Sequence, residues 1–300
     1  MGARGQAANF LTILGTAHSA MGNHERAIEL HLESRLVAQS IPDPRLDMNA
    51  LGNLANLFAR RGSQRNDMSD LAFSIKLQKE VLQTARDLGD DDAQAASLMN
   101  VGQVSVEVDG AHAALPYLEK ALLKARTCAN REIEIQSLFS LGALYRTLYA
   151  EVRSVEALDL AMAHLEAGIA LTQGRGDIRS VLTGLINVAN VHYDAGGHHY
   201  RDAVGVNEVI VSVARKGADP DLLGTALRNL SLAYAKADLL VEAIATAEEA
   251  LPVLDALSEV RARLLREDIQ EWRTNLARRA TTAQSWFSDL AAGASREPSL

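Results

Sequence analysis

The chain has 300 residues, of which 48% are hydrophobic but only 4% aromatic, so its core must be built mainly from aliphatic and small side chains. Its formal net charge of −8 argues against a nucleic-acid-binding surface, which needs a basic patch. The single cysteine, Cys128, excludes an intramolecular disulfide and a cysteine-based zinc site. No signal-peptide pattern opens the sequence, and no apolar run reaches the roughly 20 residues of a membrane helix. We therefore expect a cytoplasmic protein whose partners are neither nucleic acids nor membranes.

A short phrase recurs six times along the chain. It consists of an apolar residue, a small residue and, three positions after the small one, usually an aromatic residue or histidine. We call the small residues anchors; they are Gly15, Ala55, Gly102, Gly142, Ala189 and Ser231. Twelve residues after three of the anchors stands a second small residue, beyond a turn residue: Ala27, Ala114 and Ala243. Each unit is therefore predicted to be two helices joined by a tight turn, with small residues where the helices cross.

This pattern resembles the tetratricopeptide repeat, which places a Leu-Gly-Tyr phrase on its first helix and a small residue on its second. The best matches are Leu141, Gly142 and Tyr145, and Leu230, Ser231, Tyr234 and Ala243. The family's tryptophan is absent, and the anchor spacings of 40, 47, 40, 47 and 42 residues exceed the family norm of about 34. Long-helix versions of the repeat share such spacings, as in kinesin light chain, Pins-type modulators and bacterial signalling regulators.

The resemblance covers roughly residues 8–258 and implies an all-α protein. We expect an α-solenoid of about six helical hairpins over residues 1–258, wound into a right-handed superhelix. Gly15 and Gly102 are 87 residues apart, as are Gly102 and Ala189. This second period predicts insertions near 62–68 and 149–157 that protrude at regular intervals, unless the loop lengths coincide by chance.

Residues 259–280 are predicted to form one more helix, which closes the last apolar surface of the solenoid. Apolar side chains recur there at helical spacing, from Val260 to Leu276. Residues 281–300 are small and polar apart from Trp286, Phe287 and Leu290, and we expect a flexible tail. Either this tail is disordered, or Trp286 and Phe287 dock on the last helices or in the groove of a neighbouring copy, which would give autoinhibition or self-association.

A polar stripe lies opposite the packing side of each first helix. At about 100° per residue, the positions six before, two before, one after and five after an anchor share this side. Nineteen of the 24 residues at these positions are polar, and eight are asparagines out of thirteen in the chain. Because asparagine is a mediocre helix former, helix propensity does not explain the enrichment. We select as candidate binding residues Asn53, Asn56, Arg60, Asn100, Gln103, Glu107, Asn187, Asn190, Asp194 and Asn229.

A side-chain amide offers donors and an acceptor together, so a row of amides can hydrogen-bond the backbone of an extended peptide without needing charge. The resemblance implies that asparagine two positions before an anchor contacts a bound peptide; Asn53, Asn100, Asn187 and Asn229 fill that place. We therefore predict a non-enzymatic protein-interaction scaffold or sensor module, without a cofactor, in a signalling or regulatory system. The alternative is that these amides bridge neighbouring helices and only stiffen the array.

Two other functions remain open at this stage. His192, His198 and His199, with Asp194 or Asp202, could hold a metal and serve a metal-dependent enzyme. However, His192 occupies the aromatic position of its repeat, which is a core position, and adjacent side chains in a loop diverge, so we do not expect a metal site. The remaining alternative is a small-molecule or signalling-peptide sensor of a transcription regulator.

Overall fold

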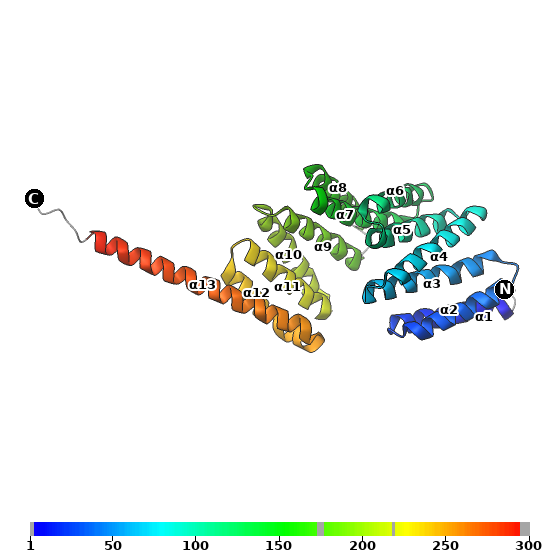
Figure 1. Cartoon of the computed structure of the whole chain (residues 1–300), viewed down its shortest axis with the longest axis horizontal. Helices are drawn as coiled ribbons and strands as arrows, with labels where there is room; N and C mark the ends of the chain where they lie inside the picture. The colour runs from blue at the N-terminus through cyan, green and yellow to red at the C-terminus, as the bar shows by residue number, and fades with distance from the viewer. Residues whose placement is uncertain (1–2, 173–176, 218–219, 295–300) are drawn as a thin grey trace, which may run out of the picture. The chain divides into compact units, whose positions relative to one another are not determined.

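The computed structural model describes residues 3–172, 177–217 and 220–294, with side chains as far as residue 286. This part of the chain contains thirteen α-helices and no strand, which confirms the all-α prediction (Figure 1). They are α1 (Ala3–Ala20), α2 (His24–Gln39), α3 (Pro44–Arg65), α4 (Met68–Asp87), α5 (Asp91–Val108), α6 (Ala111–Thr127), α7 (Arg131–Val152), α8 (Val155–Thr172), α9 (Ile178–Ala195), α10 (His199–Lys216), α11 (Pro220–Lys236), α12 (Leu240–Leu257) and α13 (Glu259–Ala294). None of these described helices combines the length and apolar character that a membrane span requires.

The chain divides into two compact units, Met1–Gly176 and Asp177–Leu300, which we call unit 1 and unit 2. Unit 1 holds four helical hairpins, α1–α2 to α7–α8, and unit 2 holds two, α9–α10 and α11–α12, followed by α13. The six predicted hairpins are therefore present. Within unit 1, the first helices α1, α3, α5 and α7 also contact one another across successive hairpins, more closely than the second helices do. The first helices thus form the inner layer of unit 1. The right-handed winding of one continuous solenoid stays a prediction.

The anchors lie where the two helices of a hairpin approach most closely. A Cβ atom added to Gly102 would lie 2.6 Å from Leu118 Cδ2, and one added to Gly142 would lie 2.6 Å from Leu165 Cδ2. The Ala55 and Ser231 anchors are fully buried. The small residue is required because the facing helix fills the space that a larger side chain would need.

A small buried residue also recurs in every second helix. The sequence pattern indicated only Ala27, Ala114 and Ala243, because longer first helices shift the spacing in repeats two and four and a two-glycine turn shifts it in repeat five. The structure shows the full set, each at most 1% exposed: Ala27, Ser74, Ala114, Ala161, Ala203 and Ala243. Four residues further on stand the residues that fill the space beside Gly15, Gly102 and Gly142, namely His31, Leu118 and Leu165.

The insertions expected near 62–68 and 149–157 do not form protruding loops. They instead lengthen α3 and α7 to 22 residues each, and each helix ends at a left-handed residue, Asn66 (φ 53°) and Arg153 (φ 54°). The extra turns are held by packing, since Gly62 lies against Leu71 at the start of α4 and Tyr149 is buried. The extra turns stay helical because no proline interrupts them and because Gly62 is held in α3 by its contact with Leu71.

Helix α13 is longer than expected. It begins at Glu259 as predicted but continues to Ala294, beyond the boundary placed at residue 280. No glycine or proline occurs between Glu259 and Leu290, so nothing in the sequence terminates the helix there. Its early turns close unit 2, since Leu265, Ile269 and Trp272 are buried. Trp286 is 61% exposed, whereas the Phe287 side chain lies outside the described residues. Self-association through this segment stays a prediction.

An ion pair fastens the extension of α3 to the next helix. Arg61 Nε and Nη2 donate to the two carboxylate oxygens of Asp70 at 2.6 and 2.7 Å, and both side chains are nearly buried. Glu25 on α2 accepts a further bond from Arg61 at 3.2 Å. The hydrogen bonds from Arg61 lower the pKa of the Asp70 carboxyl below its ordinary value of 3.8.

We expect Gly142→Ala to destabilise unit 1. The new methyl group would collide with Leu165 and lie 3.2 Å from the Ala161 carbonyl oxygen. Overpacking of this kind costs about 1–3 kcal/mol, partly offset by about 1 kcal/mol of improved helix propensity. Gly52→Ala is the matched control, because its methyl group would meet only Val81, at 4.0 Å. Urea unfolding followed by circular dichroism should place the two midpoints on opposite sides of wild type; equal midpoints would contradict the close approach.

We expect Asp70→Asn to lower the free energy of unfolding by about 1–3 kcal/mol at neutral pH, because Arg61 loses a charged acceptor. Asp70 has a lowered pKa in the folded state, so its contribution is present above the unfolded-state pKa and disappears as pH falls through the folded-state value. The difference between variant and wild type should therefore shrink as pH falls below 3.8. A difference that is independent of pH in urea titrations would argue against the ion pair.

Candidate functional site

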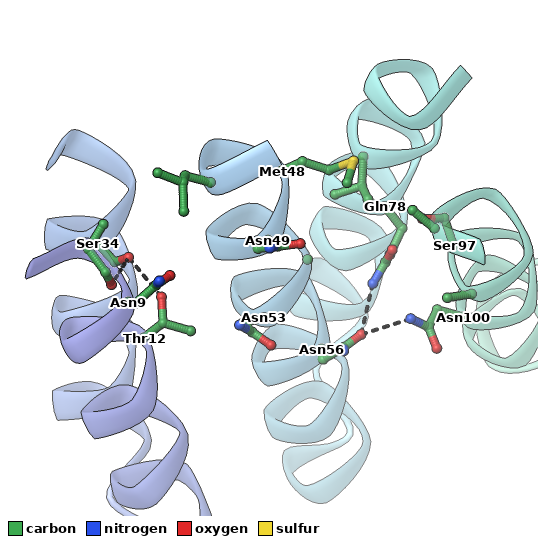
Figure 2. Close-up of a pocket in the computed structure, with 16 residues that line it drawn as sticks. Asn9, Thr12, Ser34, Met48, Asn49, Asn53, Asn56, Gln78, Ser97 and Asn100 are labelled. Atoms are coloured by element: carbon green, nitrogen blue, oxygen red, sulfur yellow. Dashed lines mark hydrogen bonds between the residues drawn. The ribbon is translucent and has the colours of Figure 1, made fainter. Parts of the chain in front are cut away.

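A pocket of about 350 Å³ opens in unit 1 between the first three hairpins. Side chains from α1 to α5 surround it, as Figure 2 shows. None of its lining residues is charged, and six carry amides: Asn9, Asn49, Asn53, Asn56, Gln78 and Asn100. The remaining lining residues are small or apolar. The pocket therefore presents polarity without net charge, within the volume range of sites for small ligands and peptide segments.

A three-amide network forms one side of this pocket. Asn56 Oδ1 on α3 accepts hydrogen bonds from Gln78 Nε2 on α4 at 2.8 Å and from Asn100 Nδ2 on α5 at 3.1 Å (Figure 2). Gln78 is 2% exposed, so its amide is held in place by the surrounding core. Because both bonds end on the Asn56 oxygen, the Asn56 amide nitrogen keeps its donors, and Gln78 and Asn100 keep acceptor oxygens.

The opposite side of the pocket is formed by the first hairpin. Ser34 on α2 donates to the Ala8 carbonyl oxygen at 2.8 Å, and its hydroxyl also lies 2.8 Å from that of Thr12. Between the two sides stand Asn49 and Asn53 on α3. In the described part of the chain, neither of these two amides has a protein hydrogen-bond partner. Both are therefore available to a ligand.

Unit 2 contains a smaller version of the same arrangement. A pocket of about 170 Å³ is lined by Ala189, Asn190, Tyr193, Asn207, Asn229 and Leu232. Its amides stand at the same repeat positions as those of unit 1: one after an anchor, four after the buried small residue of the second helix, and two before the next anchor. Asn207 is buried and donates to the Ala203 carbonyl oxygen at 2.8 Å. The amide of Asn207 is thus turned toward its own helix, unlike that of Gln78.

Three other candidate residues bridge the first helices of neighbouring hairpins in unit 1. Arg60 Nη1 donates to the Ser19 carbonyl oxygen at 3.4 Å, Ser63 donates to Glu107 at 2.9 Å, and Gln103 donates to Ser140 at 2.8 Å. These contacts are the kind that the stiffening alternative requires. The polar stripe therefore contains both bridging side chains and side chains that face a pocket.

The histidine cluster of repeat five lies at the turn between α9 and α10. Asp202 Oδ2 is 3.3 Å from His199 Nδ1 and 3.9 Å from His192 Nδ1. The rings of His192 and His199 are stacked with centroids 5.9 Å apart, and the His198 ring lies 3.9 Å from that of His199. Contrary to expectation, His192 is not fully buried in the core, since 20% of its side chain is exposed.

No protein-family model matches the sequence, and no curated protein is similar to it in sequence. The fold, in contrast, is similar to that of solved proteins. A Rap protein complexed with Competence and Sporulation Factor has a TM-score of 0.62 at 13% identity, over 91% of this chain and 76% of that one. The Rap conjugation gene regulator of plasmid pLS20, in complex with the Phr* peptide, has a TM-score of 0.55 at 13% identity, over 88% and 74%.

A signal transduction ATPase from Pyrococcus horikoshii with a tetratricopeptide repeat sensor has a TM-score of 0.61 at 15% identity, over 90% of this chain and 39% of that one. The chain therefore has the tetratricopeptide-repeat (TPR) fold. Its first helices are thus the A helices of TPR units and its second helices the B helices. At these identities the likeness carries the fold and not the binding residues.

The ten candidate residues predicted from the sequence do not form one site. Asn53, Asn56 and Asn100 come together in the unit 1 pocket, and Asn190 and Asn229 line the unit 2 pocket, while Asn187 and Asp194 lie on α9 outside it. Sequence analysis did not select Gln78 or Asn207, because both belong to B helices. Their shared register, four residues after the buried small residue, was the signal that could have found them.

Proposed function

We propose that the unit 1 pocket of this TPR protein binds an extended peptide segment of a protein partner through the peptide backbone. The amide cluster of Asn53, Asn56 and Asn100 carries the proposal. A peptide bond presents one donor and one acceptor, and a side-chain amide matches both. Because no charged side chain lines the pocket, a charged small molecule would meet no counter-ion there. A neutral backbone suits such a lining better.

The amides of the pocket are arranged to receive such a ligand. Buried Gln78 and the neighbouring Asn100 hold the oxygen of Asn56, so its nitrogen is directed before a ligand arrives. Preorganisation of this kind lowers the entropy lost on binding. Asn49 and Asn53 have no partner among the described residues, which a purely stiffening role would not require. The bridges made by Arg60, Gln103 and Glu107 support the same surface by linking successive A helices.

Two structural neighbours support a peptide as the ligand. One Rap structure holds Competence and Sporulation Factor, and another holds the Phr* peptide. By analogy, we propose that this protein is a non-enzymatic scaffold or sensor module in a signalling or regulatory system. Its acidic charge supports a partner other than nucleic acid.

The test begins with peptides selected from a random display library against the full chain. We expect Asn53→Ala and Asn100→Ala each to lower the affinity for a selected peptide by roughly 3–10-fold, which is the effect of one net hydrogen bond. Fluorescence anisotropy measures this affinity. Gln78→Leu should weaken binding while preserving stability, because leucine occupies the same register in the next two repeats, as Leu118 and Leu165. N-methylation of single peptide bonds should weaken binding more than alanine substitution of the peptide's side chains.

Gln136→Ala is the matched control, since Gln136 lies on α7, donates to Glu132 and does not line the pocket. The affinity of this variant for the selected peptide should equal that of wild type. If the asparagine variants bind as tightly as Gln136→Ala, the pocket is not the site and the amides serve only to stiffen the array. If N-methylation has no effect while side-chain changes abolish binding, backbone recognition is wrong.

A further inference from the structure

Three potential metal ligands meet at one end of the repeat-five hairpin. His192 comes from the last turn of α9, His199 is the first residue of α10, and Asp202 follows one turn later. One ligand atom from each residue can be chosen so that all lie within 4.8 Å of one another. The set combines two imidazoles with one carboxylate, on two different helices of unit 2.

The spacing of these atoms suits a small divalent cation. Zinc binds imidazole nitrogen and carboxylate oxygen at about 2.0–2.2 Å, so tetrahedral ligand atoms lie roughly 3.3–3.6 Å apart. The observed separations from Asp202 Oδ2 are 3.3 Å to His199 and 3.9 Å to His192. The pair His199–Asp202 thus already has tetrahedral spacing, and His192 must move closer, because the three ligand atoms are only within 4.8 Å of one another.

The turn that joins the two helices holds these side chains in place. Gly196 and Gly197 have positive φ angles of 72° and 59°, a conformation that permits an abrupt reversal. Tyr193 and Tyr200 pack edge to face across the turn, with ring centroids 5.6 Å apart. The tyrosine pair thus fixes the turn by packing, so the histidine rings are not needed for that purpose. The geometry is built by the hairpin itself and does not depend on a loop that must order on binding.

Packing alone does not explain histidine at this place. In repeats two and four the position three after the anchor packs against the B helix through Phe58, which meets Phe73, and Tyr145, which stacks on His164. His18 occupies the position in repeat one and is half-buried like His192. Only in repeat five, among the described residues, do a second histidine and a carboxylate of the facing B helix come within 4.8 Å of the histidine at this position.

We propose that His192, His199 and Asp202 bind a divalent transition-metal ion of the zinc class. Two neutral imidazoles and one carboxylate supply three ligands, and water completes a tetrahedral shell. Because the ligands come from both helices, the ion would tie the end of α9 to the start of α10 and stabilise unit 2. The expectation from sequence that His192 is a core residue and that this cluster holds no metal is thereby revised. This proposal concerns unit 2 and is independent of the peptide site.

The test uses the full chain, freed of metal with a chelator and dialysed. Titration with zinc chloride in a calorimeter should show one site, and zinc should raise the midpoint of thermal unfolding. Cobalt(II) should give the visible absorption of a tetrahedral site, which zinc abolishes. Asp202→Asn and His199→Asn should each lower the affinity for zinc by at least about tenfold. Asp202 is exposed, so its variant should fold normally even if a histidine variant does not.

A matched pair separates metal binding from packing. His192→Phe restores the ring that packs in repeat two and removes a ligand, whereas His18→Phe makes the same change in repeat one, away from the cluster. We expect only His192→Phe to lose zinc affinity. Wild type that binds no zinc, or equal zinc affinity in wild type, His192→Phe and Asp202→Asn, would overturn the proposal. Peptide binding by unit 1 should be unchanged in all these variants, so failure here leaves the peptide site untouched.

Discussion

The structure depends on the exclusion of side-chain volume where the two helices of each hairpin cross. At Gly102 and Gly142 the facing leucine already stands where a Cβ atom would be, and at Gly15 the ring of His31 does so. This close approach fixes the rotation of each A helix about its axis. Once that rotation is set, the residues one after and two before an anchor must lie on the side of the A helix that faces away from its B helix. The same small residues that pack the hairpin therefore decide which side chains of the A helices line the two amide pockets.

This dependence explains which parts of the structure the sequence predicts. The anchors are local and recur, so the hairpins and the polar stripe follow from spacing alone. Gln78 could not be predicted in the same way, because the extra turns of α3 shift the register of α4 by an amount that only packing reveals. The division into two units was also beyond the pattern, since the anchor spacing from Gly142 to Ala189, which crosses the division, equals the spacing from Ala55 to Gly102 within unit 1.

The amides of unit 1 can both stiffen the array and bind a ligand. A hydrogen bond from Asn100 to Asn56 adds only about 1 kcal/mol to stability, because both groups could bind water instead. Leu118 and Leu165 show that an apolar residue fills the Gln78 register without loss of the fold. The buried amide of Gln78 therefore contributes more to the orientation of Asn56 than to stability. Its hydrogen bond fixes which side of the Asn56 amide donates and which side accepts. Stiffening by this network and preorganisation for a ligand are the same physical effect.

Repeat five departs from its neighbours at several positions at once. Its aromatic position holds an imidazole, its B-helix register holds Asn207, and its turn carries two glycines where the turns of repeats four and six carry none. Natural proteins usually break local rules where function requires it. The tyrosine pair shows that the turn could have been packed by aromatic rings alone. The ring of His192 is instead placed beside His199 and Asp202, so the proposed metal site uses a position that packs an aromatic ring in repeats two and four.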